Sequence, residues 1–322
     1  MKPNADSHTL SLAHSGDPDD AFMWWPITGK VMPDGTPWAG ADGQSRLDTG
    51  PLRYRGVPGD IAVFNRRALA DAPYDLTALS VRAYADVQER YIITRMGASF
   101  GEGYGPRVVA PASDRRNAEA LLRDPGAIIA IPGFETSAFL TLGLWLGEER
   151  LRGRARFVEL PFDEIIPYVV SGRAAAGLVI HEGQITFGEA KLRSLLDLGE
   201  WWQATRHLPL PLGVNAVKRD LDQRVGSGTL ARVAQDLGAS LAYALAHRDE
   251  SVAYCLPFAA HNAAKQQMAM PSDATVRQYL DMYVTGLTQD LGDSGLMAIQ
   301  RLLEEGAAAG LCPPPKTVDV LG

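Results

Sequence analysis

The sequence has little cysteine and no long hydrophobic run. Its two cysteines, Cys255 and Cys312, form neither a CxxC motif nor a zinc-ligand spacing, which argues against a disulfide framework and for a reducing compartment. The most apolar stretch, 138–146, is far shorter than the about 20 residues that a membrane-spanning helix needs. The first residues contain no apolar segment typical of a signal peptide. We therefore expect a cytoplasmic protein without a membrane partner.

Positive charge is also scarce. Lysine and arginine number 31 against 38 aspartates and glutamates, so the net charge is −7, and no basic block occurs. This balance argues against a nucleic-acid partner, because binding phosphates requires a basic surface. The P-loop signature GxxxxGK[ST] and the metalloprotease signature HExxH are missing, and the glycine-rich loop 97–105 leads into an expected strand rather than a helix. The sequence therefore predicts no cofactor and no metal.

What the chain does contain is an alternation of short apolar runs and amphipathic stretches. With 322 residues, 46% of them hydrophobic, it is long enough for two domains. The alternation indicates parallel α/β layers. Strands are predicted over 9–13, 76–79, 91–94, 108–110, 127–131, 157–160 and 176–180, and helices over 60–70, 136–146 and 162–170.

The last third of the chain changes character. Helical periodicity occupies 229–247, 275–287 and 294–309, and no strand pattern follows about Val217. Apolar residues on these helices can support a homodimer or complete a core within one chain, and the pattern does not distinguish the two.

Two glycine- and proline-rich segments are candidate crossings between domains. One is 101–106 and the other is 208–213, and each precedes an apolar strand. If both are hinges, an outer lobe of residues 1–105 plus 212–322 holds an inserted lobe of 106–211, with a ligand cleft between them. The alternative is two ordinary loops. The segment 29–59, rich in glycine, proline and aspartate, is predicted to be a surface excursion or hairpin, with a cleft lid as the alternative.

Among the histidines, His181 has the most informative position. It directly follows the predicted strand 176–180, and the carboxyl ends of strands in α/β layers line the binding crevice. A histidine there can act as a general base near neutral pH, although a structural histidine fits equally well. Its neighbour Glu182 can orient the imidazole or point away. His14 and Ser15, which end the first strand, are further candidates.

Two other turns carry polar groups. At 133–138 a helix begins directly after a buried strand, so Thr136, Ser137 and Ala138 can cap the helix and also offer backbone N–H groups to a carboxylate. Asp17, Asp19 and Asp20 follow the first strand. They can hold a divalent cation, but the absence of a dedicated metal spacing favours helix capping or contact with a ligand.

Taken in order, these segments resemble one family, the 1,4-dihydroxy-6-naphthoate synthases of futalosine-dependent menaquinone biosynthesis. The likeness runs from about residue 9 to 315, and its most specific part is Ile180–Phe187, which matches the pattern I-H-E-[GS]-x-x-T-[FY]. Further similar segments are 79–84, 90–91, 105–110, 136–138, 197–202, 208–213, 241–247 and 290–292.

The resemblance implies a two-lobed, periplasmic-binding-protein-like (type II) fold with two hinge crossings and C-terminal helices. It implies a carbon–carbon lyase that converts cyclic dehypoxanthine futalosine, a small carboxylate, into 1,4-dihydroxy-6-naphthoate. The family's general base falls on His181. Its substrate-contacting positions fall on Ala78, Leu79, Ser80, Ser137 and Ala138.

Two segments depart from the family pattern. The first loop often reads S-P-C-P-N-D-T-F in the family, whereas this chain has Ser15–Phe22 with the sequence SGDPDDAF, and 29–59 is longer than expected. Both changes bear on which substrate is used. The rival interpretations are a solute-binding protein of the same fold and a chorismate dehydratase of the same pathway, against which the I-H-E-G segment argues.

Overall fold

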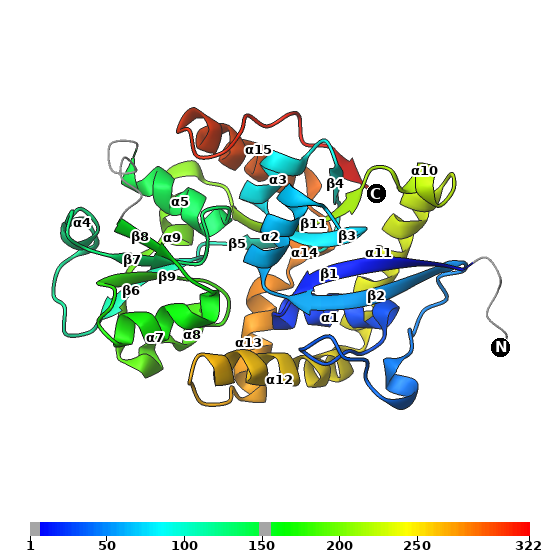
Figure 1. Cartoon of the computed structure of the whole chain (residues 1–322), viewed down its shortest axis with the longest axis horizontal. Helices are drawn as coiled ribbons and strands as arrows, with labels where there is room; N and C mark the ends of the chain where they lie inside the picture. The colour runs from blue at the N-terminus through cyan, green and yellow to red at the C-terminus, as the bar shows by residue number, and fades with distance from the viewer. Residues whose placement is uncertain (1–6, 148–155) are drawn as a thin grey trace.

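The computed structural model describes residues 7–147 and 156–322 and contains two β-sheets (Figure 1). The N-terminal residues 1–6, on which the signal-peptide argument partly rests, lie outside the described part. The first sheet has the strand order β12-β4-β11-β3-β1-β2, and β5 pairs with β11. Its strands are β1 (His8–Ser15), β2 (Leu52–Gly59), β3 (Leu76–Ser80), β4 (Tyr91–Thr94), β5 (Ser99–Gly101), β11 (Leu210–Lys218) and β12 (Val320–Leu321).

The second sheet has the order β10-β6-β9-β7-β8 and is drawn in green at the left of Figure 1. Its strands are β6 (Arg107–Pro111), β7 (Ile129–Ile131), β8 (Phe157–Glu159), β9 (Ala176–Val179) and β10 (Leu192–Asp197).

The predicted parallel α/β layers are found in part, because both sheets are mixed. β1 runs parallel to β2 and β3, and β7 runs parallel to β8 and β9, but β11 is antiparallel to β3 and β6 is antiparallel to β9. The reason is how the chain returns from the second sheet. β11 enters the first sheet beside Ser80, where β3 ends, and leaves beside Leu76, where β3 begins.

Helices cover both sheets. Those of the first 206 residues are α1 (Pro18–Thr28), η1 (Gly40–Gly43), α2 (Ile61–Ala70), α3 (Val81–Val87), α4 (Ala118–Leu122), α5 (Ser137–Leu146), η3 (Phe162–Glu164), α7 (Ile165–Val170), α8 (Gly183–Thr186), η4 (Phe187–Ala190) and α9 (Leu198–Arg206). The later ones are α10 (Leu221–Arg224), α11 (Thr229–Ala246), α12 (Arg248–Lys265), α13 (Asp273–Tyr283), α14 (Gly286–Gln289) and α15 (Gly292–Ala308). None of the helices within 7–147 and 156–322 is both long and apolar enough to span a membrane.

Local sequence explains the helix starts that position the site. Asp60 caps α2 by accepting from the Ala62 N–H at 2.6 Å, and Thr136 caps α5 by accepting from the Phe139 N–H at 3.1 Å. Short side chains with an acceptor oxygen are favoured there because the first N–H groups of a helix have no partner within it. Both helices were predicted, and their bounds agree closely with the prediction.

Other segments differ from the prediction. Residues 52–59 are not part of a surface excursion but form β2, which pairs with β1 along its whole length, and Tyr54 is buried. The helix α12 and the strand β10 were missed, and β12 lies beyond the point where strands were expected to end. These elements lack the clear periodicity of the predicted ones. Packing against α1 and α13 stabilises α12, and pairing with β6 and β4 stabilises β10 and β12.

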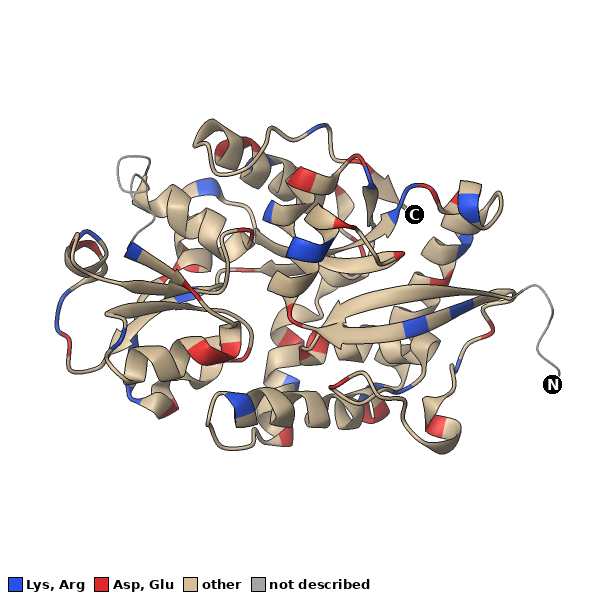
Figure 2. Ribbon diagram, viewed as in Figure 1, with Lys and Arg blue, Asp and Glu red and all other residues tan. Residues whose placement is uncertain are grey.

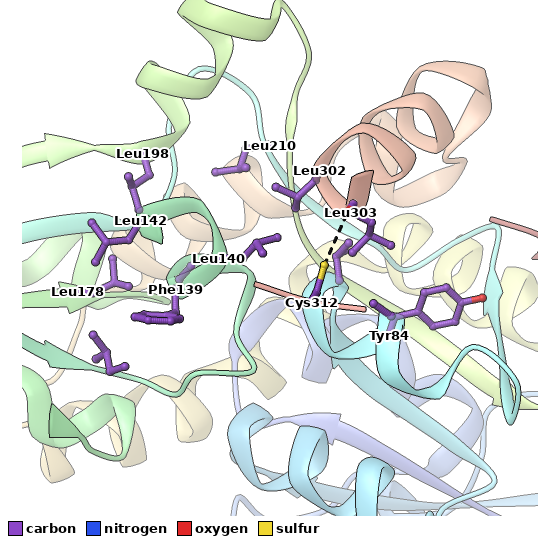
Figure 3. Close-up of a cluster of buried hydrophobic side chains, with 14 of the residues drawn as sticks. Tyr84, Phe139, Leu140, Leu142, Leu178, Leu198, Leu210, Leu302, Leu303 and Cys312 are labelled. Atoms are coloured by element: carbon purple, nitrogen blue, oxygen red, sulfur yellow. Dashed lines mark hydrogen bonds between the residues drawn. The ribbon is translucent and has the colours of Figure 1, made fainter. Parts of the chain in front are cut away.

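The largest apolar cluster joins the second sheet to α15 through α5 (Figure 3). Phe139, Leu140 and Leu142 of α5 are almost fully buried, as are Leu302 and Leu303 of α15. Because α5 contacts both the second sheet and α15, its N-terminus has a defined position relative to both sheets.

Strand membership supports the two-lobed division that we propose. The first sheet is built from residues up to 101 and from 210 onward, and the second from 107 to 197. The two expected crossings lie side by side, because β5 pairs with the start of β11 and Gly101 lies opposite Leu210. Both connections between the lobes therefore share one edge, the arrangement that a hinge requires.

Candidate functional site

A cavity lies between the two sheets. Its walls come from the carboxyl ends of strands and the starts of the following helices, as expected for α/β layers. It is lined by Ser15, Asp17, Asp19, Asp20, Ile61, Ala78, Leu79, Ser80, Gly97, Ser99, Pro106, Thr136, Ser137, Ala138, Ile180, His181, Gln184, Leu212, Gly213, Val214, Asn215, Tyr279 and Tyr283.

His181 projects into this cavity from the end of β9. Its backbone has φ +56°, a left-handed conformation that non-glycine residues rarely adopt, and α8 begins two residues later. Such a conformation is typical of functional sites, where the surrounding structure enforces it. The Phe162 ring packs edge-on against the imidazole at 4.7 Å between ring centres. The histidine is therefore held at the cavity wall.

The partner of His181 is Asp17. The Nδ1 atom lies 2.6 Å from Oδ2 of Asp17, and that oxygen also accepts from the Ser15 hydroxyl at 2.8 Å. Burial lowers the pKa of His181, but the negative charges of Asp17, Glu182 and Asp19 and the hydrogen bond with Asp17 outweigh it and raise the pKa to about 9. Asp17 occupies the N-cap position of α1 but makes no side-chain cap hydrogen bond there, so the expected capping role was wrong for this residue.

Acidic residues gather around this end of the cavity, near the start of α1 (Figure 2). Burial and the charges of its neighbours raise the pKa of Asp19 well above its usual value. Burial raises the pKa of Asp20 to about 6, although Asp20 accepts from the Ser15 N–H at 2.7 Å. Within the described residues no group of histidine, cysteine and carboxylate side chains is arranged to hold a metal ion. A ligand carboxylate is therefore disfavoured at the acidic end of the cavity.

Other parts of the cavity lining offer hydrogen-bond donors. Ser137 and Ala138, the first two residues of α5, line the cavity, and the first N–H groups of a helix have no partner within it. Ser80 is fixed by Asn65, whose amide nitrogen donates to the Ser80 hydroxyl at 2.9 Å and whose amide oxygen accepts from the Ser80 N–H at 2.9 Å. The hydroxyl proton of Ser80 is thus left to donate. A helix N-terminus beside a hydroxyl donor suits a carboxylate.

Most of the expected site residues lie together on this cavity. Ala78, Leu79, Ser80, Thr136, Ser137, Ala138, Ser15, Asp20 and His181 all line it. The Ser137 hydroxyl, however, donates to the Leu212 carbonyl at 2.7 Å and accepts from the Arg82 N–H at 3.2 Å. This hydroxyl therefore joins α5 to β11 and α3, and contact of Ser137 with the substrate stays a prediction.

Two candidates lie outside the cavity lining. His14 is buried against Phe258, bonds the Ser15 carbonyl at 2.8 Å, and has a pKa lowered to about 4 by burial. It is a neutral structural histidine. Glu182 accepts from the Asn262 amide at 3.1 Å and does not bond the imidazole, so of the two orientations left open, the one pointing away from the imidazole is observed.

Sequence reasoning missed several lining residues. Asn215 donates to the Gly97 carbonyl at 2.8 Å, and Gly97, at φ +85°, lies so close to the Trp24 ring that a Cβ would come within 2.6 Å of it. From α13, the Tyr283 hydroxyl hydrogen-bonds the Gln184 amide at 2.9 Å. The position of Gln184 beside the I-H-E-G segment was a usable signal. No local pattern singled out Tyr283, which reaches the site only through packing.

The chain has a periplasmic-binding-protein-like fold. A Candida albicans protein described as having the generic periplasmic binding protein fold superposes with TM-score 0.60 at 10% identity, covering 98% of each chain. A sequence model of the family described as "Menaquinone biosynthesis" matches residues 10–308, and the chain belongs to this family.

Two further relatives are closer in sequence. The 1,4-dihydroxy-6-naphthoate synthase of Thermus thermophilus is 33% identical over 305 residues, which are 95% of this chain and 96% of that protein. A crystal structure of an Archaeoglobus fulgidus protein is similar with TM-score 0.75 and 35% identity, covering 95% of this chain and 99% of that one. The fold class and the family expected from the sequence are confirmed.

Proposed function

We propose that this protein converts cyclic dehypoxanthine futalosine into 1,4-dihydroxy-6-naphthoate as a carbon–carbon lyase of menaquinone biosynthesis, with His181 as the general base. Membership of the menaquinone-biosynthesis family and similarity to a named synthase support the pathway. The observation that carries the catalytic part is an imidazole that lines the same cavity as a helix N-terminus able to hold a carboxylate.

The charges in the cavity orient the proposed substrate. Its carboxylate is repelled by Asp17, Asp19 and Asp20 and attracted to the N–H groups that open α5, near Ser80. Its hydroxyl groups then face the acidic end, where carboxylate oxygens accept hydrogen bonds. This pose places the sugar remnant, where bonds must break, beside His181.

The proposed chemistry begins with proton removal by His181. Above its raised pKa of about 9 the His181 imidazole is neutral. In that form it accepts a proton from the sugar remnant, and the electron pair left behind drives ring opening and carbon–carbon cleavage, after which the ring system becomes aromatic. A positioned base of this kind contributes roughly 10²–10⁴-fold to the rate. Closure of the lobes excludes water from the intermediate. The chemistry assigned to these residues requires a proton acceptor and hydrogen-bond donors.

The decisive assay incubates the purified protein with cyclic dehypoxanthine futalosine and, separately, with chorismate, and follows 1,4-dihydroxy-6-naphthoate. We expect the naphthoate from the first substrate only. Release of water from chorismate would favour the dehydratase, and tight binding without turnover would favour a solute-binding protein.

The variant His181→Ala tests the catalytic assignment. We expect a loss of turnover of about 10²-fold or more, with binding of the substrate retained in calorimetry. Turnover close to that of the wild type would refute the role of His181 as base.

A further inference from the structure

The carboxylate of Asp17 is unusual among the buried groups of this site. It is 4% exposed, one of its oxygens is shared between His181 and Ser15, and its other oxygen, Oδ1, has no hydrogen-bond partner in the described structure. A buried carboxylate with one oxygen lacking a hydrogen bond destabilises the folded protein, unless another interaction requires its charge. The short contact with the imidazole is the interaction that uses it.

The two members of this pair come from different sheets. Asp17 lies between β1 and α1, beside the first sheet, whereas His181 follows β9 of the second sheet. The contact of 2.6 Å therefore joins residues that follow strands of the two different sheets. Other contacts bridge the same gap, among them Asn262 to Glu182 at 3.1 Å and Tyr283 to Gln184 at 2.9 Å.

The contact also selects a tautomer. A carboxylate accepts hydrogen bonds, so Nδ1 of His181 carries the proton that faces Asp17 and Nε2 is the nitrogen left to accept a proton. Glu182, although adjacent in sequence, bonds Asn262 instead. The Phe162 ring packs edge-on against the imidazole. Among the carboxylates within residues 7–147 and 156–322, only Asp17 makes a hydrogen bond with the imidazole.

We propose that Asp17 is the positioning residue for His181: its carboxylate sets the tautomer and orientation of the imidazole and stabilises the imidazolium, so that the base is assembled only when the lobes close. This rests on the proposed function for its catalytic consequence. The proton taken from substrate resides on Nε2, the electron pair stays on the substrate, and Asp17 remains ionised throughout.

The experiment compares Asp17→Asn with the wild type, because asparagine keeps the size and an acceptor oxygen but removes the charge. We expect turnover at the pH optimum to fall about 10²-fold while KM changes less than about threefold. Asp17→Glu, which restores the charge, should recover part of the lost turnover. Asp34→Asn, an exposed change at the surface, is the matched control and should behave as wild type.

The pH dependence separates positioning from a merely structural role. The charged groups that face the imidazole are Asp17 and Asp19 around the start of α1, Glu182 beside it and Asp60 before α2. Removing the charge of Asp17 leaves burial as the larger influence on the pKa of His181, so this pKa should fall. The acid-side limb of the profile of kcat/KM against pH should therefore move to lower pH by about one unit or more. An unmoved limb together with unchanged turnover would overturn the proposal.

A second readout does not depend on turnover. In protein with ¹⁵N-labelled histidine, the ring signals of His181, identified by their absence in His181→Gln, report its tautomer and titration. We expect a protonated Nδ1 and a high-pH titration in the wild type that moves downward in Asp17→Asn. If the wild type makes no naphthoate but shows this signature, the proposed function is wrong and the positioning role of Asp17 stands. If the wild type is active but Asp17→Asn gives the same signature, only the positioning role of Asp17 is wrong.

Discussion

At the scale of single residues, the site is defined by where negative charge is buried. Asp17, Asp19, Asp20 and Glu182 are all at most 9% exposed, and His181 is the cationic group among them. The expectation that His181 would lie at a strand end was sound because it depended only on the preceding apolar run. The contact between Asp17 and His181 joins residues from the two sheets, and no local sequence pattern predicts such a contact.

Glu182 leads to a prediction about stability and pH. Burial and the charge of Asp17 raise its pKa from 4.5 to about 7, so the folded protein binds a proton that the unfolded chain has lost between these values. The stability of the wild type therefore falls as pH rises from about 4.5 to 7, and the penalty is complete above pH 7. In Glu182→Gln this penalty is removed, so the variant should gain up to about 3 kcal/mol relative to wild type between pH 5 and pH 8.

Urea unfolding of both proteins at pH 5, 6, 7 and 8 measures this difference. Glu304→Gln on the exposed side of α15 serves as the control, and its difference from wild type should not vary over this range. A constant difference between Glu182→Gln and wild type would contradict the raised pKa.

At the scale of elements, close contact between backbones fixes the position of the 101–106 crossing relative to α9. Gly199, near the start of α9, packs directly on the segment that carries the chain between the sheets. A Cβ at this position would lie 1.9 Å from the Tyr104 carbonyl oxygen. Backbone atoms cannot move aside as a flexible side chain can, so the helix or the crossing would have to shift.

We therefore expect Gly199→Ala to destabilise the protein by about 1–3 kcal/mol, although alanine favours helix elsewhere. Thermal and denaturant unfolding measure the effect. The control is Gly286→Ala in α14, where a Cβ meets no atom within 4 Å. Equal stability of Gly199→Ala and wild type would show that α9 does not pack this closely on the crossing.

At the scale of the whole molecule, we expect closure of the two proposed lobes to depend on a few buried contacts between them. Asn262 of α12 donates both to the Gly16 carbonyl in the first loop and to the Glu182 carboxylate beside His181, each at 3.1 Å. Lys265, one turn further along α12, makes an ion pair with Asp163 at 3.4 Å, but its side chain is 53% exposed. Exposed ion pairs contribute little, whereas loss of a buried partner leaves a charge unsatisfied.

Asn262→Ala should therefore raise KM by about tenfold and leave the complex with the naphthoate product more open, as small-angle X-ray scattering would show. Lys265→Ala, the matched change on the same helix, should alter KM by less than about twofold. Similar effects of the two substitutions would mean that closure is governed by overall charge rather than by the buried contact.

The sequence by itself determined the local features: the strands 9–13 and 176–180, the caps at Asp60 and Thr136, the place of His181 and the family. These follow from periodicity, capping chemistry and short motifs, which involve neighbours within a few residues. Only the tertiary structure decided that β2 is a core strand, that the Ser137 hydroxyl donates to the Leu212 carbonyl, and that Asp17 contacts the His181 imidazole. Each of these depends on which distant segments are brought together. A hydrogen bond or strand pairing between remote residues produces no periodic pattern in the sequence.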